Sequence, residues 1–326
     1  MLNKKLFLNQ EFFSDRCELL PIREGFGLGL LDAGDDKRVV AVSADLSESV
    51  KVDGFAKKNP ERYVEVGVAE QNMAGIGAGL ALGGKIPFIT SFGVFNPMRN
   101  LDQIRVSVCY SNLNVKILGS HAGFSNGRDG ATHQALEDVA ITRVLPNMSV
   151  VCPCDALQMR KLIPIVRDHF GPVYIRSFRE PTKVVTTDKT PLRFGKGQIF
   201  IEGTDITLIS SGPIITNVLD AAKVLQSKHN INVEVINIHT IKPIDSELIT
   251  ESVKKTGRCI VVEEHQVSGG LGGLVCEVLA PFGKYPVEIV GVLDSFGESG
   301  SYEELLDKYG LSTNTIIEKV LKFHQI

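Results

Sequence analysis

Residues 66–82 read VGVAEQNMAGIGAGLAL, a run of small and apolar residues that a single acid, Glu70, enters. The spacing of the apolar positions predicts a helix over residues 69–82. Its glycines and alanines would let a backbone or a ligand approach closely. Glu70 has two interpretations. An acid in a first turn stabilises the helix dipole, whereas an acid held away from water can exchange protons with a small molecule. Spacing alone favours the first.

The sequence around this helix alternates between strand-like and helix-like segments. Such alternation predicts a parallel sheet with helices on both faces. The expected strands cover residues 39–43, 86–90, 115–118, 149–152 and 173–175, and the other helices cover residues 100–110, 135–143 and 156–169.

A polar stretch over residues 180–196 interrupts the alternation and is interpreted as an interdomain linker. We therefore expect an α/β protein with two doubly wound domains of unequal size. The first covers residues 1–185, the linker 186–198, and the smaller second domain 199–326. In the second, strands are expected at 206–209, 233–238, 259–262 and 287–290, and helices at 213–226, 245–254, 271–279 and 314–323.

Composition narrows the class of protein. Hydrophobic residues make up 43% of the 326 residues, and the net charge is −3. These values predict a soluble protein and give no electrostatic support for binding nucleic acid or a membrane surface. No apolar run approaches the roughly 20 residues of a membrane span, and residues 1–14 do not resemble a signal peptide. Cys152 and Cys154 lack a second pair for zinc, so reduced thiols and a cytoplasmic location are expected.

Two histidines stand near predicted strand or helix ends. His133 lies in the loop sequence DGATHQ at residues 129–134, beside Asp129 and Thr132. His121 follows the strand expected at 115–118. Ligands bind at strand ends in open parallel sheets, which favours a functional role for both imidazoles. The alternative is structural, with Thr132 capping the next helix.

Other residues have similarly divided interpretations. Phe92 and Phe95 follow a strand and either pack in the core or stack on a flat heterocycle.

The turn GGLGG at residues 269–273 superficially suggests a dinucleotide loop. No acidic residue follows it at the right distance to bind a ribose, so it is interpreted as a packing turn. Three further residues are each typical of a solvated surface, yet together they can hold a phosphate: Arg23, Ser49 and Arg179.

Several spaced motifs resemble transketolase. The sequences SADL (43–46), GVAEQNM (67–73), DGATHQ (129–134) and PNMS (146–149) follow the order and spacing of its pyrimidine-binding domain. The sequences KPID (242–245) and EEH (263–265) resemble its C-terminal domain. The resemblance covers nearly the whole chain.

The resemblance also implies a partner. Large transketolases hold the thiamine diphosphate phosphates and a divalent metal through a Gly-Asp-Gly motif followed by an Asn, in a preceding domain. Here Gly34-Asp35-Asp36 lacks the second glycine. The chain therefore resembles the C-terminal subunit of a split transketolase. The resemblance implies that an N-terminal subunit holds the diphosphate and Mg²⁺ or Ca²⁺. It also implies an α₂β₂ heterotetramer in which this chain forms a homodimer.

Roles follow residue by residue from the same resemblance. Glu70 matches the glutamate that hydrogen-bonds N1′ of the aminopyrimidine and favours the imino tautomer, which deprotonates thiazolium C2. His133 and His121 match histidines that orient hydroxyls and move protons. The remaining matches are Phe95 and Phe92 for stacking on the pyrimidine, Asp45 for an acid near the cofactor, Asp129 for the acceptor hydroxyl, and His121, Arg23, Ser49 and Arg179 for the sugar phosphate.

The implied reaction is transfer of a two-carbon ketol unit from a ketose phosphate to an aldose phosphate, as in the pentose phosphate route. Residues 96–103, NPMRNLDQ, differ from the large transketolases and lean toward two related classes. These are the 2-oxo acid dehydrogenase E1 β-subunit and 1-deoxyxylulose-5-phosphate synthase. The first would have a Gln-His pair in the histidine loop, and the second usually carries its first domain on the same chain. A non-catalytic partner subunit is the alternative from a different class.

Overall fold

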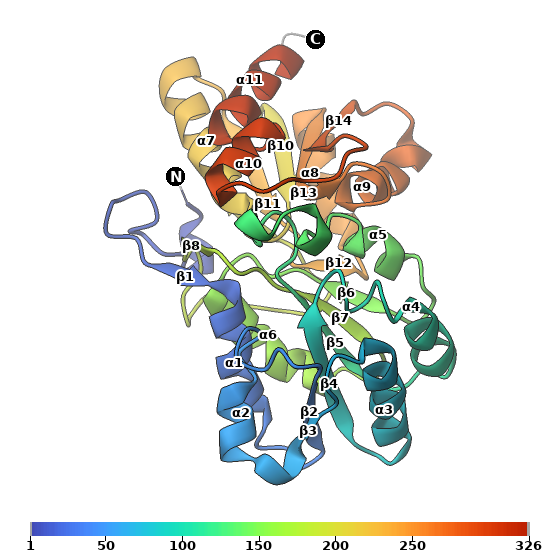
Figure 1. The fold of residues 1–326 in the computed structure, drawn as a ribbon. Coiled ribbons are helices and arrows are strands. Elements are labelled where there is room, and N and C mark those ends of the chain that lie inside the picture. Colours follow the sequence, from blue (N-terminus) through green and yellow to red (C-terminus); the bar gives the residue numbers. More distant parts are fainter. Residues whose placement is uncertain (1, 325–326) are drawn as a thin grey trace.

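A seven-stranded sheet forms the centre of the first half of the chain in the computed structural model, which describes residues 2–324 (Figure 1). Six of its strands run parallel. Its central strands are wholly buried, as expected when helices cover both faces. In spatial order the strands are β12 (Thr240–Lys242), β6 (Ser149–Val151), β7 (Val173–Arg176), β5 (Lys116–Ser120), β4 (Ile86–Phe92), β2 (Val39–Ser43) and β3 (Tyr63–Glu65).

Helices lie on both sides of this sheet, as the alternation predicts (Figure 1). The helix expected over residues 69–82 begins at Glu70 itself. One side carries α1 (Ile22–Ala33), α2 (Asp53–Lys58) and α6 (Ala156–Asp168), the other carries α3 (Glu70–Leu82), α4 (Leu101–Gln103) and the π-helix η3 (Ile104–Tyr110), and α5 (Asp138–Arg143) faces the second half of the chain.

Helix α1 was not predicted, because its sequence holds three glycines and glycine is a poor helix former. The structure shows what two of them do. A Cβ atom on Gly25 would lie 1.9 Å from the carbonyl oxygen of Ala156, and one on Gly29 would lie 2.8 Å from that of Arg160. The glycines thus let α1 pack directly against α6. Tertiary packing outweighs the low intrinsic propensity of this segment.

A five-stranded sheet forms the second half, again between two layers of helices (Figure 1). In spatial order the strands are β14 (Val287–Val292), β13 (Cys259–Gln266), β10 (Ile206–Ser210), β11 (Val233–Asn237) and β9 (Gln198–Ile201). The helices are α7 (Ile215–His229), α8 (Ser246–Thr256), α9 (Leu271–Leu279), α10 (Tyr302–Lys308) and α11 (Thr313–His324).

No helix among residues 2–324 is long and apolar enough to cross a bilayer.

Each of the two large, mainly parallel sheets ends in an antiparallel edge strand, which the sequence did not predict. The edge strand β12 comes from the second half of the chain yet pairs with β6 of the first. Strands of three or four residues are too short to show a periodicity in sequence. Within the polar stretch, β8 (Pro181–Lys183) pairs with β1 (Leu19–Pro21) and is therefore ordered strand. The linker bounds 186–198 stay a prediction.

The glycine-rich turn at 269–273 is a packing turn, as the sequence indicated. The carboxylate of Glu263 accepts hydrogen bonds from the backbone N–H groups of Leu271 and Gly272 at the start of α9, at 2.7 and 3.0 Å. A Cβ atom on Gly270 would lie 2.0 Å from that carboxylate. A side chain of the chain itself therefore fills the position where a dinucleotide phosphate would lie.

A buried arginine joins the two halves of the chain. Arg176, at the end of β7, donates from Nε to Asp138 Oδ2 at 2.8 Å, and its Nη2 donates to the backbone carbonyl of Glu264 at 3.0 Å. The Tyr174 hydroxyl donates to the same Asp138 oxygen at 2.7 Å. Both charged side chains are almost fully buried. One guanidinium thus holds α5 and β13 against the end of the first sheet.

We expect Arg176→Met to lower the free energy of unfolding by roughly 3–5 kcal/mol, because it leaves the buried Asp138 carboxylate without its cation. Urea unfolding followed by circular dichroism measures this. Arg160→Met is the matched control. Its ion pair with Asp32 is half-exposed, so the expected cost is at most about 1 kcal/mol. Equal losses for the two variants would contradict the role given to Arg176.

Candidate functional site

The carboxyl group of Glu70 is buried although it stands at the first residue of a helix. Its side chain is 2% exposed, and Oε2 accepts a hydrogen bond from Arg99 Nη1 at 2.8 Å. The backbone carbonyl of Glu70 accepts a further bond from Asn100 Nδ2 at 3.1 Å. An acid that served only the helix dipole would lie in solvent. Burial beside an ionised partner is the environment expected of a functional carboxyl group.

Two phenylalanines lie on the other side of Arg99 from this carboxyl group's hydrogen bond and form a stacked pair. Phe92 is the last residue of β4, and Phe95 follows in the next turn. Their rings are nearly parallel, with centroids 5.9 Å apart, and the guanidinium of Arg99 lies 4.2 Å from the centroid of Phe95. Arg99 therefore links the Glu70 carboxylate to the aromatic pair.

The turn between Phe95 and Arg99 is held by two buried asparagines. Asn96 Nδ2 donates to the carbonyl groups of Ile89 and Leu118, which lie on neighbouring strands. Asn100 Nδ2 donates to Asn96 Oδ1 at 3.0 Å as well as to Glu70. These bonds fix the position of the turn relative to both the sheet and α3.

Both predicted histidines contact the aromatic pair. The His121 ring stacks on Phe92, with centroids 3.8 Å apart. The His133 ring approaches Phe95 edge-on at 5.5 Å. Asn126 Nδ2 donates to the backbone carbonyls of both histidines and so sets their spacing. Two residues twelve apart in sequence thereby meet around one pair of rings.

His121 is buried among cations. It follows β5 with a φ of 57°, a left-handed conformation that is uncommon for a residue with a side chain. Its Nε2 lies 3.5 Å from Arg23 Nη1, which also donates to the backbone carbonyl of Ser49 at 3.0 Å. Burial, followed by the charges of Arg23 and Arg179, lowers the pKa of His121 to about 3. The imidazole is therefore neutral at physiological pH.

The remaining predicted residues lie around this core. Arg179 Nη1 donates to Asp129 Oδ2 at 3.3 Å, with both side chains about half-exposed. Ser49 contributes its backbone carbonyl to Arg23 rather than the predicted hydroxyl. Asp45 lies exposed after β2, and no hydrogen bond or ion pair within residues 2–324 joins it to the aromatic pair.

The second half of the chain supports the histidine loop. Glu264 Oε1 accepts from the Phe124 N–H at 2.6 Å, and Oε2 accepts from the Tyr302 hydroxyl at 2.7 Å. A Cβ atom on Gly123 would lie 2.1 Å from Oε1, so only glycine fits there. Burial raises the pKa of Glu264 to about 7. The loop that carries His121 and His133 is thus positioned by β13 and α10.

Sequence reasoning missed Arg99, Asn100 and Glu264 as site residues. Arg99 and Asn100 belong to the stretch that differs from the large transketolases, and only the fold brings them to Glu70. The sequence pattern that could have pointed to Arg99 and Asn100 is their spacing: each lies four residues after another residue of the site, Phe95 and Asn96 respectively. Glu264 lies 140 residues from its partner Phe124, a distance that no local pattern reports.

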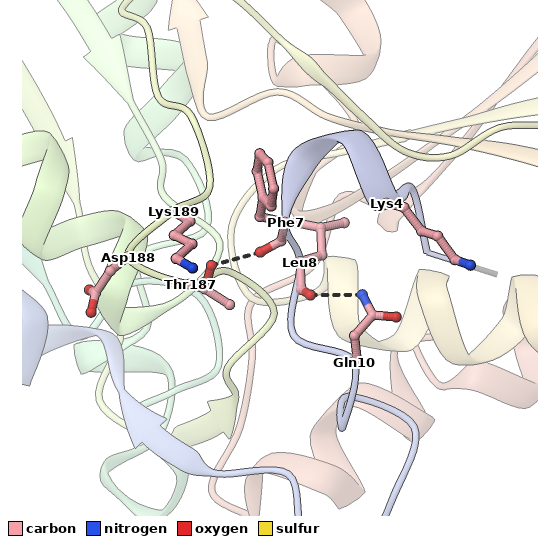
Figure 2. A pocket seen from close by; sticks show the side chains of 7 residues that line it. All are labelled: Lys4, Phe7, Leu8, Gln10, Thr187, Asp188 and Lys189. Carbon is pink, nitrogen blue, oxygen red and sulfur yellow. Dashed lines mark hydrogen bonds between the residues drawn. The ribbon is translucent and has the colours of Figure 1, made fainter.

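A separate hollow of about 630 Å³ lies between the N-terminal segment and the predicted linker (Figure 2). The Thr187 hydroxyl donates to the Phe7 carbonyl at 2.6 Å, and Gln10 Nε2 donates to the Leu8 carbonyl at 2.9 Å. The residues that line this hollow include none of the predicted site residues. The aromatic and histidine cluster remains the candidate site.

Comparison with known proteins identifies the family. The family model of the transketolase pyrimidine binding domain matches residues 22–183, and that of the transketolase C-terminal domain matches residues 195–316. The chain belongs to the transketolase family. Transketolases use thiamine diphosphate, and this chain carries the pyrimidine-binding and C-terminal parts found in split transketolases.

Relatives of similar length support the split arrangement. A 6-deoxy-6-sulfo-D-fructose transketolase subunit of Clostridium sp. is 41% identical over 87% of this chain and 88% of its own length. An apulose-4-phosphate transketolase subunit of Phocaeicola vulgatus is 39% identical over 94% and 98%. A solved structure described as a split gene transketolase, inactive beta4 tetramer, has 43% identity and a TM-score of 0.87, covering 93% of this chain and 98% of its own.

The residues of this transketolase chain fit the aminopyrimidine end of the cofactor. That ring needs an apolar face to stack on and a carboxyl group at its edge. Phe95 provides a half-buried ring, and Glu70 provides a buried carboxyl group that shares Arg99 with it. The Arg99 guanidinium, a planar cation with N–H donors, already contacts both groups. The site therefore accepts a flat, hydrogen-bonding group at this position.

We expect His121 to stay neutral from pH 5 to pH 8, because burial and neighbouring guanidinium groups disfavour the imidazolium. Arg23→Gln should raise the pKa of His121, since it removes one of the repelling charges. NMR of protein labelled with ¹⁵N-histidine measures the titration, and His121→Asn identifies the signal. A His121 signal that titrates between pH 5 and pH 8 in the wild-type chain would contradict this account.

Proposed function

We propose that this chain is the subunit of a thiamine-diphosphate-dependent transketolase that holds the pyrimidine end of the cofactor and the sugar. With a subunit that carries the diphosphate-binding domain, it transfers a two-carbon ketol unit from a ketose phosphate to an aldose phosphate. The observation that carries this proposal is that Arg99 joins the buried Glu70 carboxyl group to an aromatic pair flanked by two histidines.

Glu70 is the proposed catalytic acid toward the cofactor. Its carboxyl group would hydrogen-bond the ring nitrogen N1′, and Phe95, with Phe92, would stack on the pyrimidine. Thiamine diphosphate held by these residues would supply the nucleophilic and electron-sink chemistry at the sugar carbonyl. The chain supplies orientation, exclusion of water and control of one proton at N1′. We also propose Asp45, at the carboxyl end of β2, as an acid on the cofactor side.

The sugar phosphate is the proposed ligand of the cationic group. Arg23, Arg179 and the neutral His121 lie near one another. Arg23 Nε is a buried donor without a hydrogen-bond partner among residues 2–324, which favours an anionic ligand there. The backbone of Ser49 keeps this guanidinium in place. A phosphate oxygen would satisfy the free donor.

His133 and Asp129 are the proposed contacts to the sugar hydroxyls. His133 lies beside the aromatic pair, where the reacting carbons would be, and hydrogen-bonds Thr132 through Nδ1 at 2.9 Å. Asp129 is half-exposed and paired with Arg179. A carboxylate at this place can accept a hydrogen bond from a hydroxyl group of the incoming aldose. His133 and His121 together orient hydroxyls and move protons during transfer.

The partner is proposed to be an N-terminal transketolase subunit that carries the diphosphate site and the ligands of Mg²⁺ or Ca²⁺. We propose an α₂β₂ assembly in the cytoplasm, with this chain dimerising as well as pairing with its partner. The split-gene relative forms an inactive tetramer of β subunits. That description supports the view that this kind of subunit alone is inactive. Domain bounds of 1–185 and 199–326, with a linker at 186–198, belong to the same proposal.

The reaction class is tested by assaying the mixed complex. Xylulose 5-phosphate with ribose 5-phosphate is the first substrate pair, and pyruvate tests dehydrogenase or synthase chemistry. Because two relatives are named for a sulfosugar and for apulose 4-phosphate, other ketoses are tested as further donors. Turnover of ketoses but not pyruvate supports transketolase activity. Turnover of pyruvate alone would overturn it, and an inactive complex would favour a non-catalytic subunit.

We expect Glu70→Gln to lower the turnover of the mixed complex by roughly 10²–10⁴-fold, because an amide cannot exchange the proton at N1′. Steady-state assays measure this loss, and circular dichroism checks that the chain folds. Glu251→Gln, an exposed position on α8, is the matched control and should leave turnover unchanged. Near-normal turnover of the folded Glu70→Gln complex would refute the proposed role.

A further inference from the structure

Arg99 occupies both contacts that the proposed cofactor needs from this chain. Its Nη1 donates to Glu70 Oε2 at 2.8 Å, and its guanidinium carbon lies 4.2 Å from the centroid of the Phe95 ring. A guanidinium is planar, carries N–H donors on its edge and stacks on aromatic rings. An aminopyrimidine is also planar, stacks on aromatic rings and hydrogen-bonds through its edge, at N1′, to a carboxyl group. One side chain of this chain therefore makes the contacts that the pyrimidine would make.

We propose that Arg99 is an internal stand-in for the aminopyrimidine, which holds Glu70 and Phe95 in the cofactor-free subunit and must swing away when thiamine diphosphate binds. This inference rests on the proposed function. It assigns Arg99 a role in determining cofactor affinity, as a competitor for the same carboxylate and the same ring face.

The surrounding structure allows the side chain to move while its backbone stays fixed. The Arg99 carbonyl accepts from Gln71 Nε2 at 3.3 Å, and the next residue, Asn100, is fully buried and bonded to Glu70. The Arg99 side chain itself is 45% exposed. With this much of the side chain in solvent, rotation about its own bonds can free the ring and the carboxylate without moving the turn.

The test is the affinity of the mixed complex for thiamine diphosphate, measured by isothermal titration calorimetry with Mg²⁺ present. Arg99→Gln should lower the Kd about tenfold, because the competing ion pair and ring contact are lost. Arg160→Gln is the matched control, since that arginine is also 45% exposed and paired with a carboxylate, on α6. It should leave the Kd unchanged.

A double-mutant cycle separates competition from a general loosening of the site. In the Glu70→Gln background Arg99 has lost its ionised partner, so Arg99→Gln should improve affinity by a clearly smaller factor. The proposal that Arg99 stands in for the aminopyrimidine would be overturned by an unchanged or higher Kd for Arg99→Gln. It would also be overturned if Arg99→Gln changed the Kd by the same factor in both backgrounds. If the wild-type complex binds no thiamine diphosphate, the proposed function fails as well, so the two failures are distinguishable.

Discussion

The buried guanidinium of Arg176 is the constraint on which the arrangement of this chain depends. It stands at the end of a central strand, pairs with Asp138 on α5, and donates to main-chain carbonyls on both halves, those of Ala135 and Glu264. A charge in such a place is tolerated only when every donor meets an acceptor. The two sheets therefore have little freedom to shift relative to each other at this point.

That constraint reaches the candidate site through the loop between β5 and α5. The loop begins at His121 and ends near Ala135, whose carbonyl accepts from Arg176. Glu264 follows Glu263, which caps the start of α9. Its carboxyl group holds this loop by accepting a hydrogen bond from the N–H of Phe124, near the loop's beginning. The second half of the chain thus supports the loop that carries the two histidines. Its role is to fix the position of two imidazoles.

The site itself depends on the edge where β4 and β5 end. Phe92 and His121 stack there because their strands are neighbours in register, and Asn96 ties the following turn to both strands. Glu70 reaches the same place from α3, through Arg99 and Asn100. A buried carboxyl group, a stacking surface and two imidazoles are thereby collected from four separate segments. Arg99 shows that a planar, hydrogen-bonding group fits between the carboxyl group and the aromatic pair.

The sequence alone determined the α/β class, most strands and helices, and the residues around which the site is built, because apolar periodicity and spaced motifs are local or repeated signals. It did not reveal α1, whose glycines become intelligible only against α6. Nor did it reveal the short edge strand β12, which crosses to the first sheet. From its spacing alone, Glu70 was better explained as a partner of the helix dipole. Only tertiary structure decided that its carboxyl group is buried against Arg99, and that Glu264 supports a loop 140 residues away. Burial and long-range hydrogen bonds depend on which surfaces meet, and no stretch of sequence encodes that by itself.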